Sequence, residues 1–477
     1  MSSLKQLKES FVSDLTGGSI EEIYFVTSVA LTSYLSYKFI RDSIAQLPLV
    51  YDYVINVLTI LTAITIYNNN PSFLHYSIFI PSLLVYLLNH YTTGQQKRDH
   101  HKEKKATDAL LTRKQFLTAY RSHMLIITNL AILAVDFKIF PRRFAKVETW
   151  GTSMMDLGVG SFVFSMGLVY SRQLIKSQSS YKFSFKAYLR IIKQSTIKAL
   201  PLLVLGFARF VSVKKLEYQE HVTEYGIHWN FFITLGLLPV LLGVLDPILN
   251  ILPRVVVAFA LIALNEFILQ KTNALEIILS SENRLVNFVT MNKEGIYSFL
   301  GYFTIFIFGQ SFGSFVLTEY PTRNNLISIS KAKAPRKGSN LLTVSTTQGL
   351  IIATVFYQVL FSIVDNSNNF TSISRRLANA SYVLWVVSYN ATFLLAYNLI
   401  DKFLPEPSNL TSELLESVNN NGLLAFLLGN LLTGLINMSI NTLEVSNTVA
   451  FLILIGYSAV WISTVIVLNR KQIYIKL

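Results

Sequence analysis

Apolar runs of about 18 residues or more recur along the whole chain, and runs of this length are typical of membrane-spanning helices. In lipid the backbone polar groups need partners within the protein, which favours helices. Hydrophobic residues make up 52% of the 477 residues and charged residues only 14%, against about 25% in soluble domains. The sequence therefore predicts an all-α, polytopic integral membrane protein with a single transmembrane domain over residues 1–477.

Run length and apolar content predict about thirteen spans. They cover residues 20–39, 49–67, 73–88, 116–135, 152–170, 197–213, 231–249, 251–269, 296–317, 350–364, 382–400, 422–440 and 449–468. An odd number of spans places the two termini on opposite sides of the membrane.

Lysine and arginine gather in alternate connecting loops, chiefly 94–115, 172–193 and 323–346 and the C-terminal tail. Cytosolic loops of membrane proteins carry such an excess, so we expect a lumenal N-terminus and a cytosolic C-terminus. Loop 323–346 is polar enough to be disordered. The net charge of +14 is explained in this way, and no nucleic-acid partner is expected. The glycosylation sequons at Asn369 and Asn379 fall on the lumenal side.

Several reaction classes lack their usual sequence features. The chain contains no cysteine, which excludes thiolate nucleophiles, disulfides and thiolate metal sites. It has no GxxxxGK[ST] loop for nucleotide phosphates and no GxSxG elbow. The Glu- and His-rich segment 214–230 lacks HExxH spacing. We therefore expect neither a metal site nor a bound cofactor.

The link between the fourth and fifth spans is unusually rich in charge. It holds Asp136, Lys138, Arg142, Arg143, Lys146, Glu148 and Asp156. Four cations on a lumenal link depart from the positive-inside rule, which suggests that they hold an anionic headgroup or phosphate.

Asp136 and Lys146 stand on the two sides of the turn at Pro141 and could meet. A carboxylate can take a proton from an attacking hydroxyl, and a cation can stabilise the oxyanion that develops. The alternative is a structural ion pair that closes a helical hairpin.

Polar residues elsewhere provide weaker candidates. Segment 214–230 contains His228, Trp229 and Asn230, which could contact a headgroup. Asn430 and Asn437 lie inside one predicted span and could line a cavity, although such groups often form interhelical hydrogen bonds instead.

Long strings in the chain are familiar. FPRRFAKVETWGTSMMDLGVGSFVF (140–164), LEYQEHVTEYGIHWNFF (216–232) and NNGLLAFLLGNLLTGLINMS (420–439) resemble segments of the fungal GPI-anchored wall transfer protein family. Its members are the inositol acyltransferases of glycosylphosphatidylinositol (GPI) assembly, and the mammalian counterpart is the phosphatidylinositol-glycan class W protein.

The resemblance implies an acyltransferase in the endoplasmic reticulum membrane. It would move a long acyl chain from palmitoyl-CoA, a co-substrate rather than a cofactor, to the inositol of glucosaminyl-phosphatidylinositol. Its partners would be these two substrates and membrane lipids. The catalytic acidic and basic residues of the family fall on Asp136 and Lys146.

On this reading Arg142 and Arg143 would hold a phosphate, and Gly158, Gly160, Phe162 and Phe164 would set the width of the space for the acyl tail. The full set of candidate substrate-binding residues is Arg142, Arg143, Glu148, Trp150, Asp156, Gly158, Gly160, Phe162, Phe164, His228, Trp229, Asn230, Asn430 and Asn437. One departure from the family is Lys138, where an uncharged residue is expected. An additional cation there should lower the pKa of Asp136.

Three other functions remain open at this stage. A transporter or lipid scramblase would also have cavity-facing polar groups. A membrane-bound O-acyltransferase of the histidine type would depend on His123 or His228. A non-catalytic assembly subunit would tolerate changes throughout residues 136–156.

Overall fold

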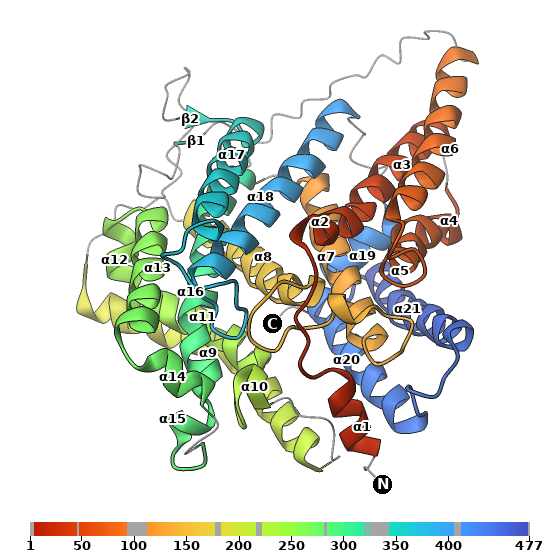
Figure 1. Ribbon diagram of the computed structural model, residues 1–477. Coiled ribbons are helices and arrows are strands. Elements are labelled where there is room, and N and C mark those ends of the chain that lie inside the picture. The colour runs from red at the N-terminus through yellow and green to blue at the C-terminus, as the bar shows by residue number, and fades with distance from the viewer. Residues whose placement is uncertain are drawn as a thin grey trace.

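The computed structural model describes residues 4–44, 47–92, 111, 113–176, 183–215, 222–280, 284–318, 322–323, 343–404 and 412–475. The fold is almost entirely helical (Figure 1). In chain order the helices are α1 (Leu4–Phe11), α2 (Ile20–Thr27), α3 (Val29–Ser43), α4 (Leu49–Tyr53), the π-helix η1 (Val54–Leu58), α5 (Thr59–Ile64), α6 (Pro71–Thr92), α7 (Gln115–Ala134), the 3-10 helix η2 (Arg142–Phe144), α8 (Met154–Lys176), α9 (Phe185–Lys215), α10 (Val222–Tyr225), α11 (Phe231–Val244), α12 (Asp246–Ile251), α13 (Arg254–Lys271), α14 (Ala274–Leu279), α15 (Phe288–Met291), α16 (Lys293–Val316), α17 (Thr346–Asp365), α18 (Ala380–Phe403), α19 (Glu413–Asn420), α20 (Gly422–Ser439) and α21 (Asn447–Arg470).

Two short strands, β1 (Thr322–Arg323) and β2 (Thr343–Val344), form an antiparallel pair. Most of the two basic loops, 94–110 and 324–342, lies outside the described residues, so their predicted properties stay predictions.

Nine helices in the described part of the chain are long and apolar enough to cross a membrane: α6, α7, α8, α9, α16, α17, α18, α20 and α21. The all-α, polytopic membrane class is thereby confirmed. The other predicted spans coincide with shorter or more polar helices. These are α2 with α3, α4 to α5, α11 and α13. The count of thirteen and the orientation of the termini stay predictions.

Loops that the sequence places on one side of the membrane contact one another. Glu148 N donates to Leu15 O at 3.0 Å, and Gly151 N donates to Ile373 O at 2.9 Å. These contacts join the segment before α2, the link between α7 and α8, and the link between α17 and α18. We call this end of the bundle, which also carries α1, α10, α14 and α15 (Figure 1), the Asp136 face.

Other helix ends meet at the other end of the bundle, which we call the opposite face. Lys38 near the end of α3 pairs with Asp401 near the end of α18 at 2.8 Å. Arg470 at the end of α21 pairs with Glu413 at the start of α19 at 2.5 Å. The ends of α3, α18 and α21 thus lie at the face opposite the end of α7.

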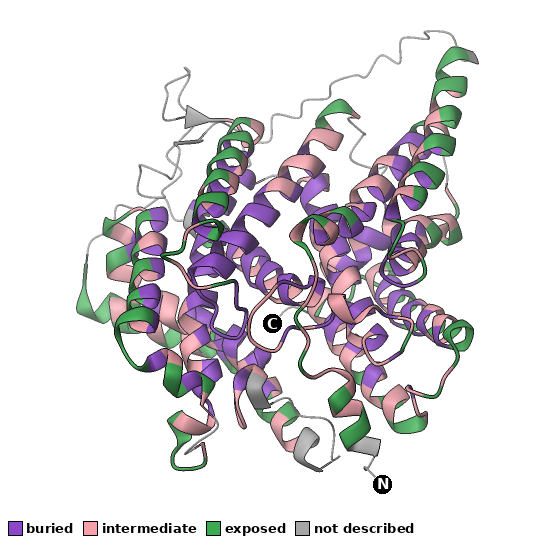
Figure 2. Ribbon diagram, viewed as in Figure 1, coloured by how far each residue is buried: buried purple, intermediate pink, exposed green. Residues whose placement is uncertain are grey.

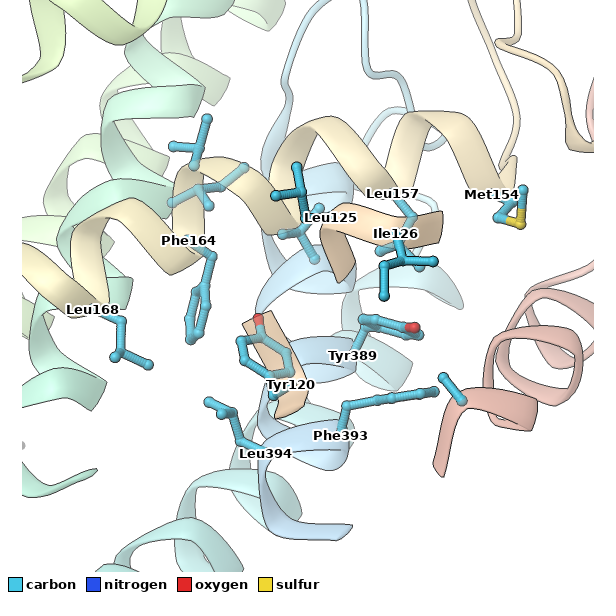
Figure 3. Packing of buried hydrophobic residues seen from close by; sticks show 14 of the residues in the cluster. Tyr120, Leu125, Ile126, Met154, Leu157, Phe164, Leu168, Tyr389, Phe393 and Leu394 are labelled. Carbon is cyan, nitrogen blue, oxygen red and sulfur yellow. The ribbon is translucent and has the colours of Figure 1, made fainter. Parts of the chain in front are cut away.

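Buried apolar residues concentrate in the central helices, whereas the outer helices expose theirs (Figure 2). Rings and aliphatic side chains from α7, α8 and α18 interlock in the centre (Figure 3). Exposed apolar residues such as Leu84, Val204 and Phe207 lie on α6 and α9, as expected for surfaces that contact lipid.

Helices α8 and α16 pack closely against each other. A side chain at Gly309 would place its Cβ 2.2 Å from Phe164 O, and one at Gly167 would place it 2.1 Å from Phe306 O. Small residues at such crossings let two backbones approach closely. This pair of glycines fixes α8, and with it the link that precedes α8.

Candidate active site

The link from α7 to α8 crosses the Asp136 face as a series of tight turns. Pro141 precedes η2, and its fixed φ suits the residue before a helical turn. Gly151 has φ +130°, a conformation that side chains disfavour. The link is held by the segment before α2 on one side and by residue 373 on the other.

Asp136 stands just beyond the end of α7 and is half-buried. Its Oδ2 accepts a hydrogen bond of 2.6 Å from Asn437 Nδ2 in α20. Burial raises the pKa of Asp136 to about 6, and this rise is limited by the Asn437 hydrogen bond and by the positive charges of Lys8, Arg142 and Lys146. A carboxylate with this pKa can accept a proton near neutral pH.

Lys138, two residues beyond Asp136, has an exposed side chain. Desolvation outweighs the nearby positive charges, so the pKa of Asp136 rises rather than falls. The leading positive charges that act on Asp136 are those of Lys8, Arg142 and Lys146. The lowering expected from Lys138 itself stays a prediction.

Lys146 is bound by a different acid from the one that its spacing suggested. Its Nζ donates to Glu224 Oε1 at 2.7 Å, and among the described residues it forms no ion pair with Asp136. Lys146 nevertheless lies near enough to act on the charge of Asp136. The alternative of an Asp136–Lys146 ion pair closing the hairpin is thus not observed.

Glu224 connects Lys146 to a buried arginine. Arg375 Nη1 lies 3.5 Å from Glu224 Oε1, and its Nε donates to Asp156 Oδ1 at 2.6 Å. Burial alone would raise the pKa of Glu224, but Lys146 and Arg375 outweigh it and hold that pKa at about 2. Lys146, Glu224, Arg375 and Asp156 therefore form a continuous charged chain, which we call the Glu224 chain.

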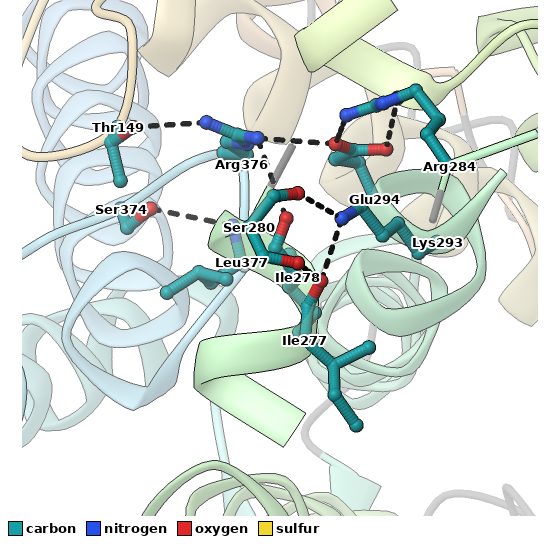
Figure 4. A network of polar contacts seen from close by, with 10 residues as sticks. All are labelled: Thr149, Ile277, Ile278, Ser280, Arg284, Lys293, Glu294, Ser374, Arg376 and Leu377. Atoms are coloured by element: carbon teal, nitrogen blue, oxygen red, sulfur yellow. Dashed lines mark hydrogen bonds and ion pairs between the residues drawn. The ribbon is translucent and has the colours of Figure 1, made fainter. Parts of the chain in front are cut away.

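The loop that carries Arg375 is itself fixed by a polar network (Figure 4). Arg376 Nη2 lies 3.1 Å from Glu294 Oε1, and Arg284 pairs with the same carboxylate. Lys293 Nζ donates to the carbonyl oxygens of Ile277 and Ser280 at the end of α14. These contacts hold Arg375 in place for Asp156.

Arg142 and Arg143 are engaged within the protein. Arg142 donates to the carbonyl oxygens of Val135, Phe137 and Phe140 at 2.8–3.2 Å. Arg143 Nε donates to Glu22 Oε1 at 2.7 Å. Arginines satisfied in this way stabilise the link, and phosphate binding by either would require these contacts to be exchanged. Their substrate role stays a prediction.

Half-buried residues of three helices face one another between the two faces. Gly158 in α8 would place a Cβ 3.6 Å from Thr128 Oγ1 in α7 and near nothing else. Phe162 packs against Phe426 with ring centroids 5.5 Å apart, and Phe426 begins a stripe of α20 that contains Asn430 and Asn437. We call the line of Thr128, Gly158, Phe162, Asn430 and Asn437 the seam.

Two residues expected beside the acyl chain lie elsewhere. Phe164 is fully buried and packs at 5.1 Å against Phe312. Gly160 faces Val386 and Tyr382, and a Cβ there would lie 2.4 Å from Val386. Both therefore belong to the packing of α8 against its neighbours, because their side of α8 is not the side of Phe162.

The remaining candidates mostly organise the local backbone. Asn230 caps α11 and donates to Gly206 O at 2.8 Å. Trp229 Nε1 donates to Thr234, and the His228 backbone donates to Asn292. Trp150 packs against a small apolar cluster containing Leu269, Ile278 and Leu377. Glu148 is half-buried. Their substrate roles stay predictions.

The two sequons differ in accessibility. Asn369 is exposed. Asn379 is fully buried, caps α18 through Tyr382 N and donates to Thr371 Oγ1 at 2.8 Å. The expectation for Asn379 is corrected, because the folded chain does not present this amide to a modifying enzyme.

His123 is a structural group. It is 1% exposed, and its ring nitrogens bond to Tyr397 at 2.8 Å and to Asn56 at 3.0 Å. Both nitrogens are thus occupied, which argues against the histidine-type mechanism at this position. No cluster of His, Asp or Glu suited to a metal ion occurs within the described ranges.

Sequence reasoning missed three residues of the site: Lys8, whose Nζ donates to Asn437 Oδ1 at 3.2 Å, Glu224 and Arg375. The sequence could have marked Arg375 as a candidate, because Arg375 and Arg376 are cations on a link assigned to the lumen. Like the cations of residues 136–156, they depart from the positive-inside rule.

The fold and the site define a polytopic, all-α membrane protein with a linked set of charged residues at one face of its bundle. A family model described as GWT1 matches residues 4–468. Over the full length of both chains the sequence is 63% identical to GPI-anchored wall transfer protein 1 of Candida albicans, 54% to that of Debaryomyces hansenii and 43% to that of Saccharomyces cerevisiae. The chain belongs to the GPI-anchored wall transfer protein family, as the resemblance indicated.

Proposed function

We propose that this protein acts in GPI-anchor biosynthesis as an acyl-CoA:inositol O-acyltransferase of the endoplasmic reticulum membrane. It would transfer a palmitoyl chain to the inositol of glucosaminyl-phosphatidylinositol. The observation that carries the proposal is the half-buried Asp136, whose pKa of about 6 suits a general base and which has a lysine within electrostatic range.

The acyl transfer requires one base and one source of positive charge. Asp136 would take the proton of the inositol hydroxyl, and that oxygen would attack the thioester carbonyl. Lys146 would stabilise the tetrahedral oxyanion. The C–O ester bond forms in this attack, and the C–S bond breaks when the tetrahedral intermediate collapses. The leaving thiolate of coenzyme A takes up the proton that Asp136 received.

Lys146 is held in place by a less exposed carboxylate. Its side chain is 37% exposed while Glu224, at 18%, holds the ammonium. Glu224 is in turn fixed by Arg375. Electrostatic catalysis depends on such preorganised charges, so the Glu224 chain would position Lys146.

The decisive experiment uses the purified protein in lipid nanodiscs with labelled palmitoyl-CoA and glucosaminyl-phosphatidylinositol. We expect acylated lipid and free coenzyme A in equal amounts. Asp136→Asn and Lys146→Ala should each lower turnover by about 100-fold or more. Asp365→Asn, an exposed carboxylate at the end of α17, is the matched control and should leave turnover unchanged.

Lipid movement between leaflets without consumption of palmitoyl-CoA would instead support a scramblase. Near-normal turnover in both Asp136→Asn and Lys146→Ala would contradict the proposed roles even if the activity itself is present.

A further inference from the structure

An arginine lies inside α7, at the end of the seam remote from Asp136. Arg121 Nη1 donates to Asn419 Oδ1 at 2.6 Å, and its Nε donates to Ser165 Oγ at 3.2 Å. Three helices, α7, α8 and α19, therefore converge on one half-buried guanidinium. Charge within a membrane span is costly and usually marks function.

A second arginine lies near this guanidinium. Arg172, exposed on α8 two turns beyond Ser165, lies within electrostatic range of Arg121. In the part of the chain that the structure describes, no carboxylate lies within 4.0 Å of either guanidinium. Two like charges that approach each other without an acid favour binding of an anion.

Other cations of the opposite face have acids of their own. Arg113 pairs with Glu416 at 2.7 Å, and Lys38 pairs with Asp401 at 2.8 Å. Within the described ranges, the partners of Arg121 are a neutral hydroxyl oxygen and an amide oxygen. Among these described cations, Arg121 and Arg172 thus differ from Arg113 and Lys38 in having no acid partner.

The seam joins this pair to the catalytic candidate. Arg121 and Asp136 are 15 residues apart along α7 and the turn after it, which corresponds to about 22 Å of helix. Ser165 lies one turn of α8 from Phe162, so Arg121 stands directly beyond the Phe162–Phe426 contact. A long, thin substrate with an anionic end would match this arrangement.

We propose that Arg121 and Arg172 form a phosphate-binding site for the acyl-coenzyme A donor on the face opposite Asp136. This inference rests on the proposed function. The guanidinium groups bind the phosphate esters of coenzyme A, and the pantetheine arm follows the seam so that the thioester reaches Asp136. The acyl donor then enters from the opposite face, which the loop charges predict to be cytosolic.

The first test measures both substrates in nanodiscs of neutral lipid. Arg121→Gln and Arg172→Gln should each raise the KM for palmitoyl-CoA roughly 10-fold, as expected for the loss of a charged hydrogen bond. The KM for glucosaminyl-phosphatidylinositol should stay unchanged. Arg113→Gln, whose partner is Glu416, is the matched control and should alter neither constant. An unchanged KM for palmitoyl-CoA in both variants overturns the proposal.

The second test separates coenzyme A from an anionic lipid headgroup as the source of the phosphate. Free coenzyme A should protect the wild-type protein from thermal unfolding, and this protection should be lost in Arg121→Gln. If the variant keeps that protection but loses stabilisation by added phosphatidylinositol, the pair binds lipid and the proposal is wrong.

One outcome keeps this proposal distinct from the proposed function. A wild-type protein that binds coenzyme A through Arg121 but transfers no acyl chain would contradict the function and not the site. If Arg121→Gln fails to fold, Arg121→Lys retains the charge without the planar fork, and it should raise the KM for palmitoyl-CoA less than Arg172→Gln does.

Discussion

The chemistry of a single carboxylate depends on what surrounds it. Asp136 has one direct hydrogen-bond donor, Asn437, and several cations at longer range. Desolvation raises its pKa more than these groups lower it. The residue is thus kept as a usable base by partial burial and not by a neighbouring acid.

The pH dependence of turnover tests this account. A base must be deprotonated, so kcat/KM should fall about tenfold for each pH unit below about 6. The Lys8 charge lowers the pKa of Asp136, so Lys8→Met should raise it and move the acid limb to higher pH. Lys138→Met, which removes an exposed cation, should leave the limb in place. A shift with Lys138→Met and none with Lys8→Met would refute the assignment.

Glu224 is proposed to act by positioning Lys146. Its pKa of about 2 keeps it ionised at every assay pH, so its effect is positional. Glu224→Gln should lower kcat roughly 10-fold or more through misplacement of Lys146, with KM for both substrates nearly unchanged. Glu224→Asp should recover part of kcat.

The control is Glu22→Gln, which removes an ion pair with Arg143 on the same face. This variant should leave kcat unchanged. A loss of thermal stability that parallels the loss of kcat in Glu224→Gln would indicate a purely structural role.

At the scale of helices, close packing of α8 on α16 sets the position of the site. Gly309 faces the backbone of Phe164, and a Cβ there would meet its carbonyl at 2.2 Å. The seam residues Gly158 and Phe162 belong to the same helix α8. A displacement of α8 would therefore change the site and the seam together.

Gly309→Ala should destabilise the protein by about 1–3 kcal/mol, as overpacking does, and lower the midpoint of thermal unfolding in detergent. Gly434→Ala is the matched control, since nothing lies within 4 Å of a Cβ at that position in α20. Equal midpoints of thermal unfolding for the two variants would show that the close packing of α8 on α16 does not contribute to the free energy of unfolding.

At the scale of the whole molecule, the described connections gather at two faces of the bundle. The Asp136 face joins the α1–α2 segment to the links after α7 and α17. At the opposite face, the end of α3 pairs with the end of α18, and the end of α21 pairs with the start of α19. The loop charges predict that the first is lumenal.

The absence of cysteine makes this orientation simple to test by labelling. In sealed endoplasmic reticulum vesicles, Lys471→Cys should react with a membrane-impermeant maleimide, and Lys138→Cys should react only after the membrane is permeabilised. Both side chains are exposed, so access differs only by side. The reverse pattern of labelling would invert the topology.

Much of this architecture follows from local sequence. Apolar run length predicted the helical segments, and the charge of the loops predicted which connections share a face. Residues 136–156 stood out because charge is rare in a chain of this composition. The long strings 140–164 and 216–232 indicated the family.

The pairing of side chains was not predictable in the same way. Spacing suggested that Lys146 would face Asp136, yet its partner is Glu224, 78 residues away. The state of Asp136 depends on Asn437, 301 residues away. Arg121 became a candidate through its hydrogen bonds to Ser165 and Asn419 and its proximity to Arg172.

By itself, then, the sequence determined the membrane class, the helical segments and the region of the candidate site, because insertion into lipid depends on the polarity of each short segment in turn. The tertiary structure alone decided which charges meet, how deeply Asp136 is buried and where the seam runs. Ion pairing and desolvation act over a few ångströms in space, and only packing of the helices brings distant residues within that range.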